Sequence, residues 1–444
     1  MKRGYLKVTL AVILLLMFAV ITGCAKKEDN QTAKTNAAGQ EEVKDQGTAE
    51  EKADVKAEEK TEEKTEEKAT PTPATEEAQP AETEEQATAE QEAASQVTLN
   101  IEGGIKDVYA QVGMRAGTCL SEFMLFDSKH KDIIKENFNT ITLENLMKPD
   151  YILDKAASMA AGDIVVNFTP KTKELLDWAK ENGMSVRGHV LVWYSQTPDW
   201  IFYNEFDKTK GLVDRDTMLA RMESYIRQTF ELLDTLGYSE MFYAYDVVNE
   251  ALLDNGAYRD CLWKKIIGDD YIWYAFKYAD QYAPENIKLY YNDFNEQFKT
   301  PHFMKLAQSL VDETGRSLID GIGCQGHLYT QDSIDDYMNM LKAYKTLGLE
   351  VQITELDVSL GTWQKILPAT EENLIAQGKY YYELVNRIIT ENAAGNTNVS
   401  GITFWGFSDF LSWRRDRSPV LFDKNNNPKL AYYGALQDRA KAGY

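Results

Sequence analysis

Two stretches of the sequence decide the fold: AYDVVNE at residues 244–250 and VQITELD at residues 351–357. Each is a short apolar run that leads directly into a glutamate, Glu250 in the first and Glu355 in the second. Short apolar runs rich in β-branched residues are typical of strands that are buried on both faces. Each glutamate is therefore predicted to be held rigidly where a buried strand ends.

Six further strand-like runs follow Val97, at residues 114–120, 140–144, 185–193, 287–292, 321–327 and 401–408. Amphipathic helical stretches lie between them. One begins at Thr169-Pro170, a favoured helix start, and ends before Gly183. Eight β/α repeats in about 340 residues predict an α/β fold of the (β/α)8 TIM barrel type over residues 97–444. An open, doubly wound sheet is the alternative, but the glycine-rich phosphate turn typical of that fold is missing after the first strand.

The first 23 residues have the layout of an export signal. Three basic residues among the first seven make a positive start, and an apolar run covers residues 10–21. That run is shorter than the ~20 residues of a spanning helix. It leads into ITGC at residues 21–24, which resembles a bacterial lipobox, so residues 1–23 are predicted to be a lipoprotein signal peptide and Cys24 the lipidated residue. We expect the protein to be exported and lipid-anchored to the cell envelope, facing outside the cytoplasm. Ordinary cleavage beside a stray cysteine is the alternative.

Residues 24–96 form a Glu/Lys/Ala/Thr-rich stretch. From residue 25 to 96 it has 21 acidic residues and nine lysines, and it lacks Leu, Ile, Met and aromatic residues. Such a segment buries too little apolar surface to offset chain entropy, so a disordered acidic linker is predicted. A spacer is the favoured role, and a partner-binding tail is the alternative.

The overall charge and the cysteines exclude other classes of protein. A formal net charge of −22 argues against nucleic acid as a partner, because phosphate would be repelled. The four cysteines lack metal-binding spacing, and the four histidines are scattered. We therefore expect no metal site readable from the sequence. Cys324 lies inside a predicted strand and is expected to be a small buried hydrophobe.

The ends of the predicted strands carry polar and aromatic residues. In a TIM barrel the chemistry is located at these carboxyl ends, and core packing does not require Glu, His or Lys there. The residues in question are Glu144, Asn145, Lys148, His189, Trp193, Gln196, Asn249, Glu250, Tyr291, Asn292, Gln325, His327, Glu355, Asp357, Trp405 and Trp413.

The two glutamates fit one kind of chemistry in particular. Acetal hydrolysis needs one carboxylic acid to protonate the leaving oxygen and a second carboxylate to attack or support the anomeric carbon. A single such glutamate is more often a salt-bridged residue of the barrel rim. The pair Glu250 and Glu355, at the ends of two buried strands, favours a glycosidase.

With these motifs in order along the chain, the region from about Ile105 to Ala440 resembles glycoside hydrolase family 10, the family of endo-β-1,4-xylanases. The resemblance implies Glu250 as acid/base and Glu355 as nucleophile. It also implies that His327 and Asp357 hydrogen-bond around the nucleophile, and that Asn249 contacts the 2-hydroxyl of the sugar under attack.

The same resemblance assigns the sugar-binding residues. Seven residues would line the subsite of the reacting sugar: Lys148, His189, Trp193, Gln196, Gln325, Trp405 and Trp413. Glu144 and Asn145 would hold the next sugar outward, while Tyr291 and Asn292 would face the leaving-group side. Aromatic platforms with a few fixed polar groups suit sugars, which have apolar faces and hydroxyl-rich rims.

One position departs from the family pattern. Tyr194 stands where the family commonly has a second histidine after Trp193. A tyrosine can donate a hydrogen bond but carries no charge near neutral pH, so we expect a shifted pH optimum and retained activity.

The resemblance implies endo-hydrolysis of xylan with retention of configuration, by a monomer that needs no cofactor. A structural calcium ion is left open. Two alternatives are a cellulase or mannanase on the same barrel and a non-catalytic surface lipoprotein that binds polysaccharide. The resemblance also implies that crowding by Trp405 and Trp413, together with Glu144, Asn145 and Lys148, favours a pentose over a hexose.

Overall fold

A computed structural model describes residues 97–444 of the protein. The predicted signal peptide, the lipidation site Cys24 and the acidic linker lie outside the described residues, so they stay predictions. Within the described range, no helix is long and apolar enough to cross a membrane.

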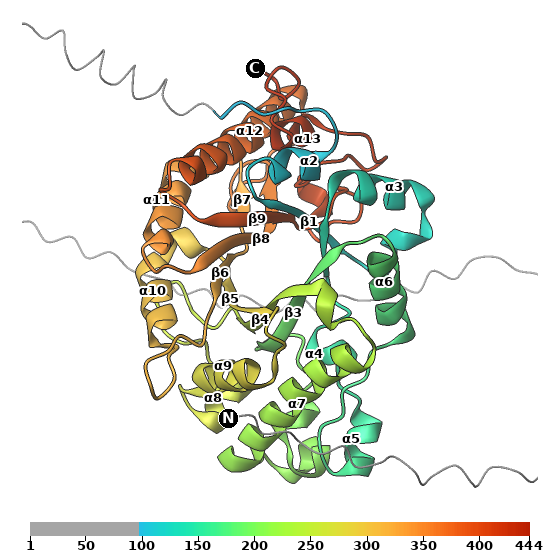
Figure 1. Ribbon diagram of the computed structural model, residues 1–444, viewed down its shortest axis with the longest axis vertical. Helices are drawn as coiled ribbons and strands as arrows, with labels where there is room; N and C mark the ends of the chain where they lie inside the picture. Colours follow the sequence, from blue (N-terminus) through green and yellow to red (C-terminus); the bar gives the residue numbers. More distant parts are fainter. Residues whose placement is uncertain (1–96) are drawn as a thin grey trace, which may run out of the picture. The chain divides into compact units, whose positions relative to one another are not determined.

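Eight parallel strands close into a barrel in the order β1-β2-β3-β4-β5-β6-β8-β9, with β9 paired back to β1 (Figure 1). The strands are β1 (Arg115–Leu120), β2 (Thr140–Leu143), β3 (Ser185–Trp193), β4 (Phe242–Asn249), β5 (Lys288–Asp293), β6 (Gly321–Cys324), β8 (Glu350–Ser359) and β9 (Val399–Phe404). The predicted TIM barrel is confirmed, and the open sheet is excluded because β6 pairs with β8 and closes the ring.

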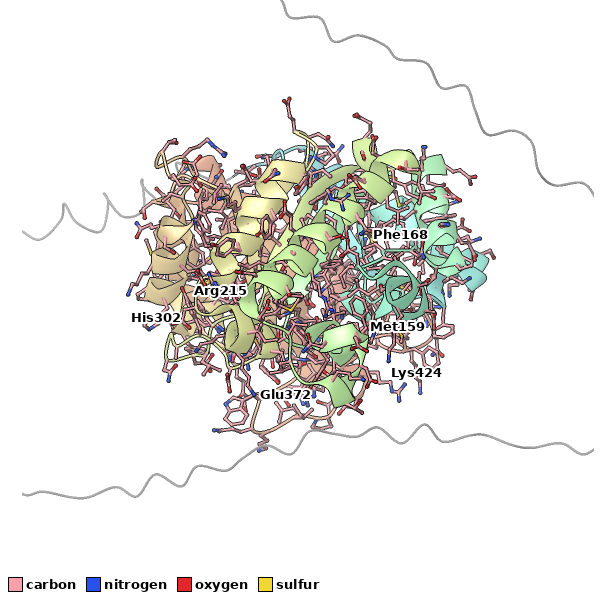
Figure 2. All side chains as sticks on the ribbon, turned by 90° about the horizontal axis from the view of Figure 1, so that it is seen from below. Met159, Phe168, Arg215, His302, Glu372 and Lys424 are labelled. Atoms are coloured by element: carbon pink, nitrogen blue, oxygen red, sulfur yellow. The ribbon has the colours of Figure 1, made fainter. Side chains whose placement is uncertain are left out.

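Helices surround the strands on the outside (Figure 1). The longer ones are α3 (Ser128–Asn137), α6 (Pro170–Glu181), α7 (Arg215–Thr235), α9 (Tyr271–Tyr282), α10 (Thr300–Ser309), α11 (Ile334–Lys345) and α12 (Glu371–Ala393). Shorter ones are α2 (Ile105–Ala110), α4 (Pro149–Ile152), α5 (Lys155–Ala161), α8 (Leu262–Ile267) and α13 (Leu430–Ala435). Charged side chains cover their outer faces, and Arg215 and His302 lie on this surface in the view from below (Figure 2).

The helix predicted from Thr169-Pro170 is α6. Its capping residue Thr169 accepts a hydrogen bond from the backbone N–H of Thr172 at 3.1 Å, and Pro170 occupies the first turn. Leu175 and Leu176 are fully buried against the barrel. Gly183 follows with φ +64°, a conformation that glycine adopts without strain and that ends the helix.

The barrel strands are buried on both faces because helices cover their outside and side chains fill their inside. Gly188 of β3 shows how tightly the layer between the strands and the helices is filled. A Cβ atom at this position would lie 2.3 Å from the ring of Tyr245 on the neighbouring strand β4. That ring packs against Phe230 of α7, 5.5 Å between ring centres, and only glycine at position 188 leaves room for it, so the layer between the barrel and its helices is closely packed.

Two predicted strands end three or more residues earlier in the structure than expected. The run at residues 321–327 is divided: β6 ends at Cys324, and a separate strand β7 (His327–Tyr329) pairs with β8. The break falls at Gly326, whose φ of +75° is incompatible with an extended strand. The run at 401–408 ends as a strand at Phe404, and the chain then turns at Gly406, φ +96°.

The structure describes three cysteines after the linker. Cys119, Cys261 and Cys324 are all free thiols, and Cys324 is fully buried, as predicted for a small core residue. Burial raises the pKa of the Cys324 thiol well above its usual value, so this side chain is chemically inert.

Candidate active site

Glu250 directly follows β4 at the carboxyl end of the barrel, and its carboxyl group is held by three donors. Trp193 Nε1 donates to one oxygen at 3.1 Å. Gln325 Nε2 and Asn249 Nδ2 donate to the other at 3.0 and 3.2 Å. Burial and the charge of Glu250 raise the pKa of the nearby Tyr194. These contacts from several strand ends fix the direction of a carboxyl group that is only 9% exposed.

Glu355 lies inside β8 and is 5% exposed. Asn292 Nδ2 donates to one of its oxygens at 2.8 Å, and His327 Nε2 lies 3.3 Å from the other. Burial acts to raise the pKa of Glu355, but the hydrogen bond from His327, the charges of His189 and His327 and the bond from Asn292 outweigh it. The pKa is lowered, so this carboxylate is ionised at neutral pH.

His327 is placed between two carboxylates. Its Nδ1 lies 3.0 Å from Asp357, opposite the contact to Glu355. Burial acts to lower the pKa of His327, but the negative charge of Asp357 and the hydrogen bonds to both acids raise it to about 9. At neutral pH the ring is a cation that donates from both nitrogens. The predicted hydrogen bonding of His327 and Asp357 around Glu355 is present.

Asp357 has two more partners from the loop after β9. Trp413 Nε1 and an Arg414 guanidinium nitrogen each donate to it at 3.0 Å. Burial acts to raise the pKa of Asp357, but the charges of His327 and Arg414 and these hydrogen bonds lower it. Arg414 was not anticipated from the sequence, because nothing in its loop position indicates that it folds back onto a strand end.

Three amide side chains connect the two glutamates. Asn249 Oδ1 accepts from Asn292 Nδ2 at 3.0 Å and from Gln325 Nε2 at 3.2 Å. Asn292 also bonds Glu355, and Gln325 also bonds Glu250. The two carboxyl groups therefore belong to a single hydrogen-bonded assembly.

A second group gathers around Lys148. Its ammonium donates to Asn145 at 3.0 Å and to Gln196 at 2.7 Å, and it lies 4.9 Å from the centre of the Trp193 ring. Burial lowers the pKa of Lys148, although nearby carboxylates oppose this. Burial likewise raises the pKa of Glu144. The structure thus brings together the residues predicted to bind the reacting sugar and the next one outward.

The two tryptophans differ in exposure. Trp405 is 6% exposed and packs edge-on against His189 at 5.6 Å between ring centres, while Trp413 is 55% exposed and lies 5.0 Å from the ring of His327. His189 is fixed by Asp246, 2.9 Å from its Nδ1. One indole is therefore part of the wall and the other is available to a ligand.

Two predictions about the leaving-group side need correction. Tyr291 is fully buried, and its hydroxyl accepts from the backbone N–H groups of Ala251 and Leu252 while donating to Asp293. It supports the turn behind Glu250 from inside the protein. Asn292 is also fully buried and orients Glu355. The family resemblance implied that both face the substrate, but their side chains are engaged by neighbouring elements.

The centre of the barrel holds an ion pair that the sequence did not reveal. Arg187 and Asp246 form a buried salt bridge, and Arg187 also donates to Gln352 at 2.9 Å. Burial acts to raise the pKa of Asp246, but Arg187 and His189 lower it. Because Asp246 accepts a hydrogen bond from the imidazole of His189, the Arg187–Asp246 pair orients the His189 ring from within the barrel. The sequence feature that could have indicated this ion pair is a charged residue inside the apolar run of each of two neighbouring strands.

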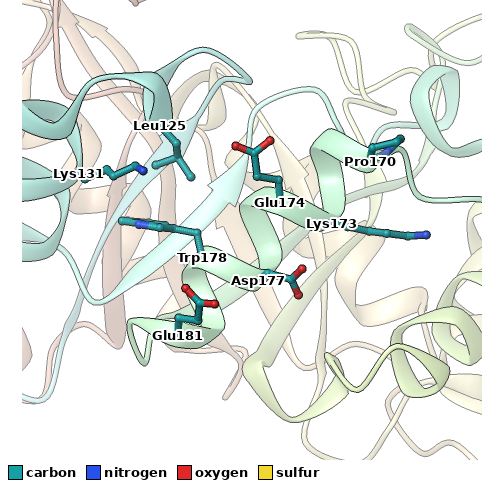
Figure 3. Close-up of a pocket in the computed structure, with 8 residues that line it drawn as sticks. All are labelled: Leu125, Lys131, Pro170, Lys173, Glu174, Asp177, Trp178 and Glu181. Atoms are coloured by element: carbon teal, nitrogen blue, oxygen red, sulfur yellow. The ribbon is translucent and has the colours of Figure 1, made fainter.

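A separate hollow lies on the outer surface between α3 and α6 (Figure 3). It is lined by Leu125, Lys131, Pro170, Lys173, Glu174, Asp177, Trp178 and Glu181. These side chains come from the outer helices and do not include any of the strand-end residues described above. Over residues 97–444, no group of three or more His, Cys, Asp or Glu side chains is arranged to hold a metal ion.

This arrangement can be compared with known proteins. Residues 104–438 match the sequence profile of glycosyl hydrolase family 10. The chain belongs to that family. Solved structures agree: the family 10 xylanase 10B modules of Clostridium thermocellum, complexed with xylohexaose, have a TM-score of 0.66 at 33% identity over 74% of this chain and 67% of that one. An endo-1,4-beta-xylanase from Caldicellulosiruptor owensensis has a TM-score of 0.64 at 32% identity, covering 75% and 99%.

Curated family 10 relatives carry similar names. The chain is 34% identical to endo-1,4-beta-xylanase B of Butyrivibrio fibrisolvens and 38% identical to the bifunctional endo-1,4-beta-xylanase XylA of Ruminococcus flavefaciens, over 73% and 72% of its length. It is 38% identical to a putative endo-1,4-beta-xylanase of Caldicellulosiruptor saccharolyticus over 66% of its length. The chain spans only 51% and 32% of the first two relatives, and 96% of the third.

Proposed function

We propose that this protein is an endo-acting β-1,4-xylanase that retains anomeric configuration. The observation that carries the proposal is the pair Glu250 and Glu355, two buried carboxyl groups in one hydrogen-bonded assembly with different supports. Glu355 is held ionised by His327, as a nucleophile must be. The matched relatives named as xylanases support xylan as the substrate.

The proposed reaction has two steps. Glu355 attacks the anomeric carbon while Glu250 gives its proton to the leaving glycosidic oxygen, so a glycosyl ester forms as the C–O bond breaks. Glu250, now ionised, takes a proton from water, which attacks the same carbon and releases Glu355. This sequence requires carboxyl groups about 5–5.5 Å apart. Proton NMR of the first-formed product should show the β-anomer, and an initial α-anomer would rule out retention.

Two variants separate the roles of the glutamates. Glu250→Ala should largely spare kcat/KM on an aryl xylobioside with an activated leaving group, because that group leaves without a proton and kcat/KM reports formation of the glycosyl ester. It should lose hydrolysis of xylan. Glu355→Ala should lose both activities. Glu350→Gln is the matched control, since Glu350 begins the same strand β8 at the opposite end of the barrel. It should keep the wild-type ratio of the two activities.

The substrate itself is tested by release of reducing sugar from xylan, carboxymethyl-cellulose, mannan and mixed-linkage glucan. A hexose polymer stays a second candidate, because one relative, 33% identical over 70% of this chain, is named exoglucanase XynX. Release chiefly from xylan supports the proposal. Release chiefly from a hexose polymer keeps the roles of the glutamates and overturns the pentose assignment, while binding of xylan without release indicates a binding protein.

We also propose that Cys24 is lipidated and that the catalytic barrel is held at the cell envelope by the acidic linker. The support is the sequence ITGC at residues 21–24 after an apolar run. Cys24→Ser should move xylanase activity from the membrane fraction to the soluble fraction of the producing cell. An unchanged distribution would contradict this assignment.

A further inference from the structure

The backbone of Glu250 adopts an unusual conformation for its residue type. Strand β4 ends at Asn249, and Glu250 then has φ +55°, in the left-handed region that non-glycine residues rarely occupy. Its N–H donates to the carbonyl of Asn292 at 2.9 Å, which ties the turn to strand β5. Such a conformation persists only where neighbouring groups hold it.

Arg259 holds the backbone of Glu250 on its other side, at the carbonyl group. Its Nε donates to the carbonyl oxygen of Glu250 at 3.0 Å. A short loop brings it there: the N–H of Arg259 donates to the carbonyl of Ala251 at 2.8 Å, and Leu252 pairs with Tyr258 in an antiparallel bridge. The Glu250 peptide is thus fixed by β5 on one side and by a guanidinium on the other.

The same guanidinium lies on the face of Tyr194. Its central carbon is 4.4 Å from the centre of the Tyr194 ring. Burial and the charge of Glu250 raise the pKa of Tyr194, so the Tyr194 side chain lies near that carboxyl group. A guanidinium over an aromatic ring is attracted to it and restricts its position. Arg259 therefore contacts Glu250 twice, directly at the backbone and through Tyr194 at the side chain.

We propose that Arg259 is a positioning residue for the general acid: it holds the left-handed backbone of Glu250 and, by stacking on Tyr194, fixes a side chain next to its carboxyl group. This inference rests on the proposed acid/base role of Glu250. Tyr194 lies near Glu250 where the family commonly has a histidine, and Arg259 supplies a permanent positive charge beside the tyrosine.

The experiment uses three variants of the whole protein: Arg259→Met, Arg259→Lys and Arg115→Met. Arg115 is a matched control because its guanidinium also lies 4.4 Å from the centre of a tyrosine ring, that of Tyr243, near the amino-terminal ends of β1 and β4. Values of kcat/KM are measured on two aryl xylobiosides, one with a poor phenyl leaving group and one with an activated dinitrophenyl group. The pH profile on the phenyl substrate is recorded as well.

Arg259→Met should lower kcat/KM on the phenyl substrate by about tenfold to a hundredfold, a part of the roughly 10²–10⁴-fold that a positioned acid contributes. It should change the dinitrophenyl reaction by less than about threefold, since that group leaves without a proton. The basic limb of the pH profile, where the acid loses its proton, should also move. Arg259→Lys should recover part of the phenyl activity, because a lysine can still donate to the Glu250 carbonyl. Arg115→Met should leave the ratio of the two substrates unchanged.

Equal losses on both substrates, or an unmoved basic limb, would overturn the inference, because loop damage without an effect on the acid would then explain the result. Glu250→Ala is assayed in parallel. If that variant separates the two substrates and Arg259→Met does not, only the role of Arg259 fails. If Glu250→Ala fails to separate them, the assignment of the acid fails and the inference falls with it.

Discussion

Replacing His327 with glutamine should move the acidic limb of the pH–rate profile upward. His327 is a cation at neutral pH, with a pKa of about 9, and lies 3.3 Å from the proposed nucleophile Glu355. Its charge and hydrogen bond favour the ionised form of Glu355, which is the form that reacts. Glutamine keeps a donor and removes the charge, so Glu355 should hold its proton to a higher pH.

The size of the effect follows from the geometry. Two unit charges 3.3 Å apart interact by about 5 kcal/mol at an effective dielectric constant of about 20, which is an upper bound for this pair. The net contribution of a hydrogen bond to a charged group, about 1.5–3 kcal/mol, is the safer figure. At about 1.4 kcal/mol per pH unit, the acidic limb should rise by about 1 to 2 units.

The assay is kcat/KM on an aryl xylobioside from pH 4 to pH 9 for the wild type, His327→Gln and a control, His130→Gln. His130 packs edge-on against Phe407, 5.3 Å between ring centres, and contacts the backbone of Met124, outside the catalytic assembly. Its variant should keep the wild-type profile. An acidic limb that stays in place or moves down in His327→Gln would refute the reasoning.

Three further predictions concern pH and packing. Tyr194→His should shift the pH–rate profile, because burial and the charge of Glu250 raise the pKa of Tyr194 and keep it neutral where a histidine would titrate; identical profiles would sink this idea. Burial raises the pKa of the Glu296 carboxyl group to about 7. The contribution of protonated Glu296 to folding stability is therefore full below the usual pKa of a glutamate and is lost as the pH rises through about 7. Glu296→Gln should therefore gain on the order of 2 kcal/mol in free energy of unfolding relative to wild type between pH 5 and pH 8, measured by urea denaturation. Gly188→Ala should lower the melting temperature in calorimetry, since its Cβ would lie 2.3 Å from the ring of Tyr245 and overpacking costs about 1–3 kcal/mol; an unchanged melting temperature would show that the ring can move aside.

Much of the barrel could be predicted from the sequence because parallel buried strands are continuous apolar runs, and a helix start such as Thr169-Pro170 is a local signal. The positions of Glu250 and Glu355 followed from the same runs. The break at Gly326 was missed because a glycine inside an apolar run is compatible with a strand, and only the pairing of β7 with β8 shows that the chain turns there.

Contacts made through space were the other part that sequence could not supply. Arg414 and Arg259 lie in loops, and their partners Asp357 and Glu250 are far away or hidden by a turn of unknown shape. Tyr291 ends a strand like the site residues do, yet its side chain faces the interior. Position along a strand predicts which end of the barrel a residue occupies but leaves open whether its side chain meets the ligand or the protein.

The divided sixth strand links two properties that an engineer would want to adjust separately. Gln325 bonds Glu250 and His327 contacts Glu355, and the two are joined only by Gly326, whose N–H donates to the buried Glu296 at 3.1 Å. A change that tilts this tripeptide displaces both supports together. Substitutions in this tripeptide that move the acidic limb of the pH–rate profile should therefore also move its basic limb. A change confined to the basic limb is better sought at Tyr194, which lies near Glu250 and follows a different strand, β3.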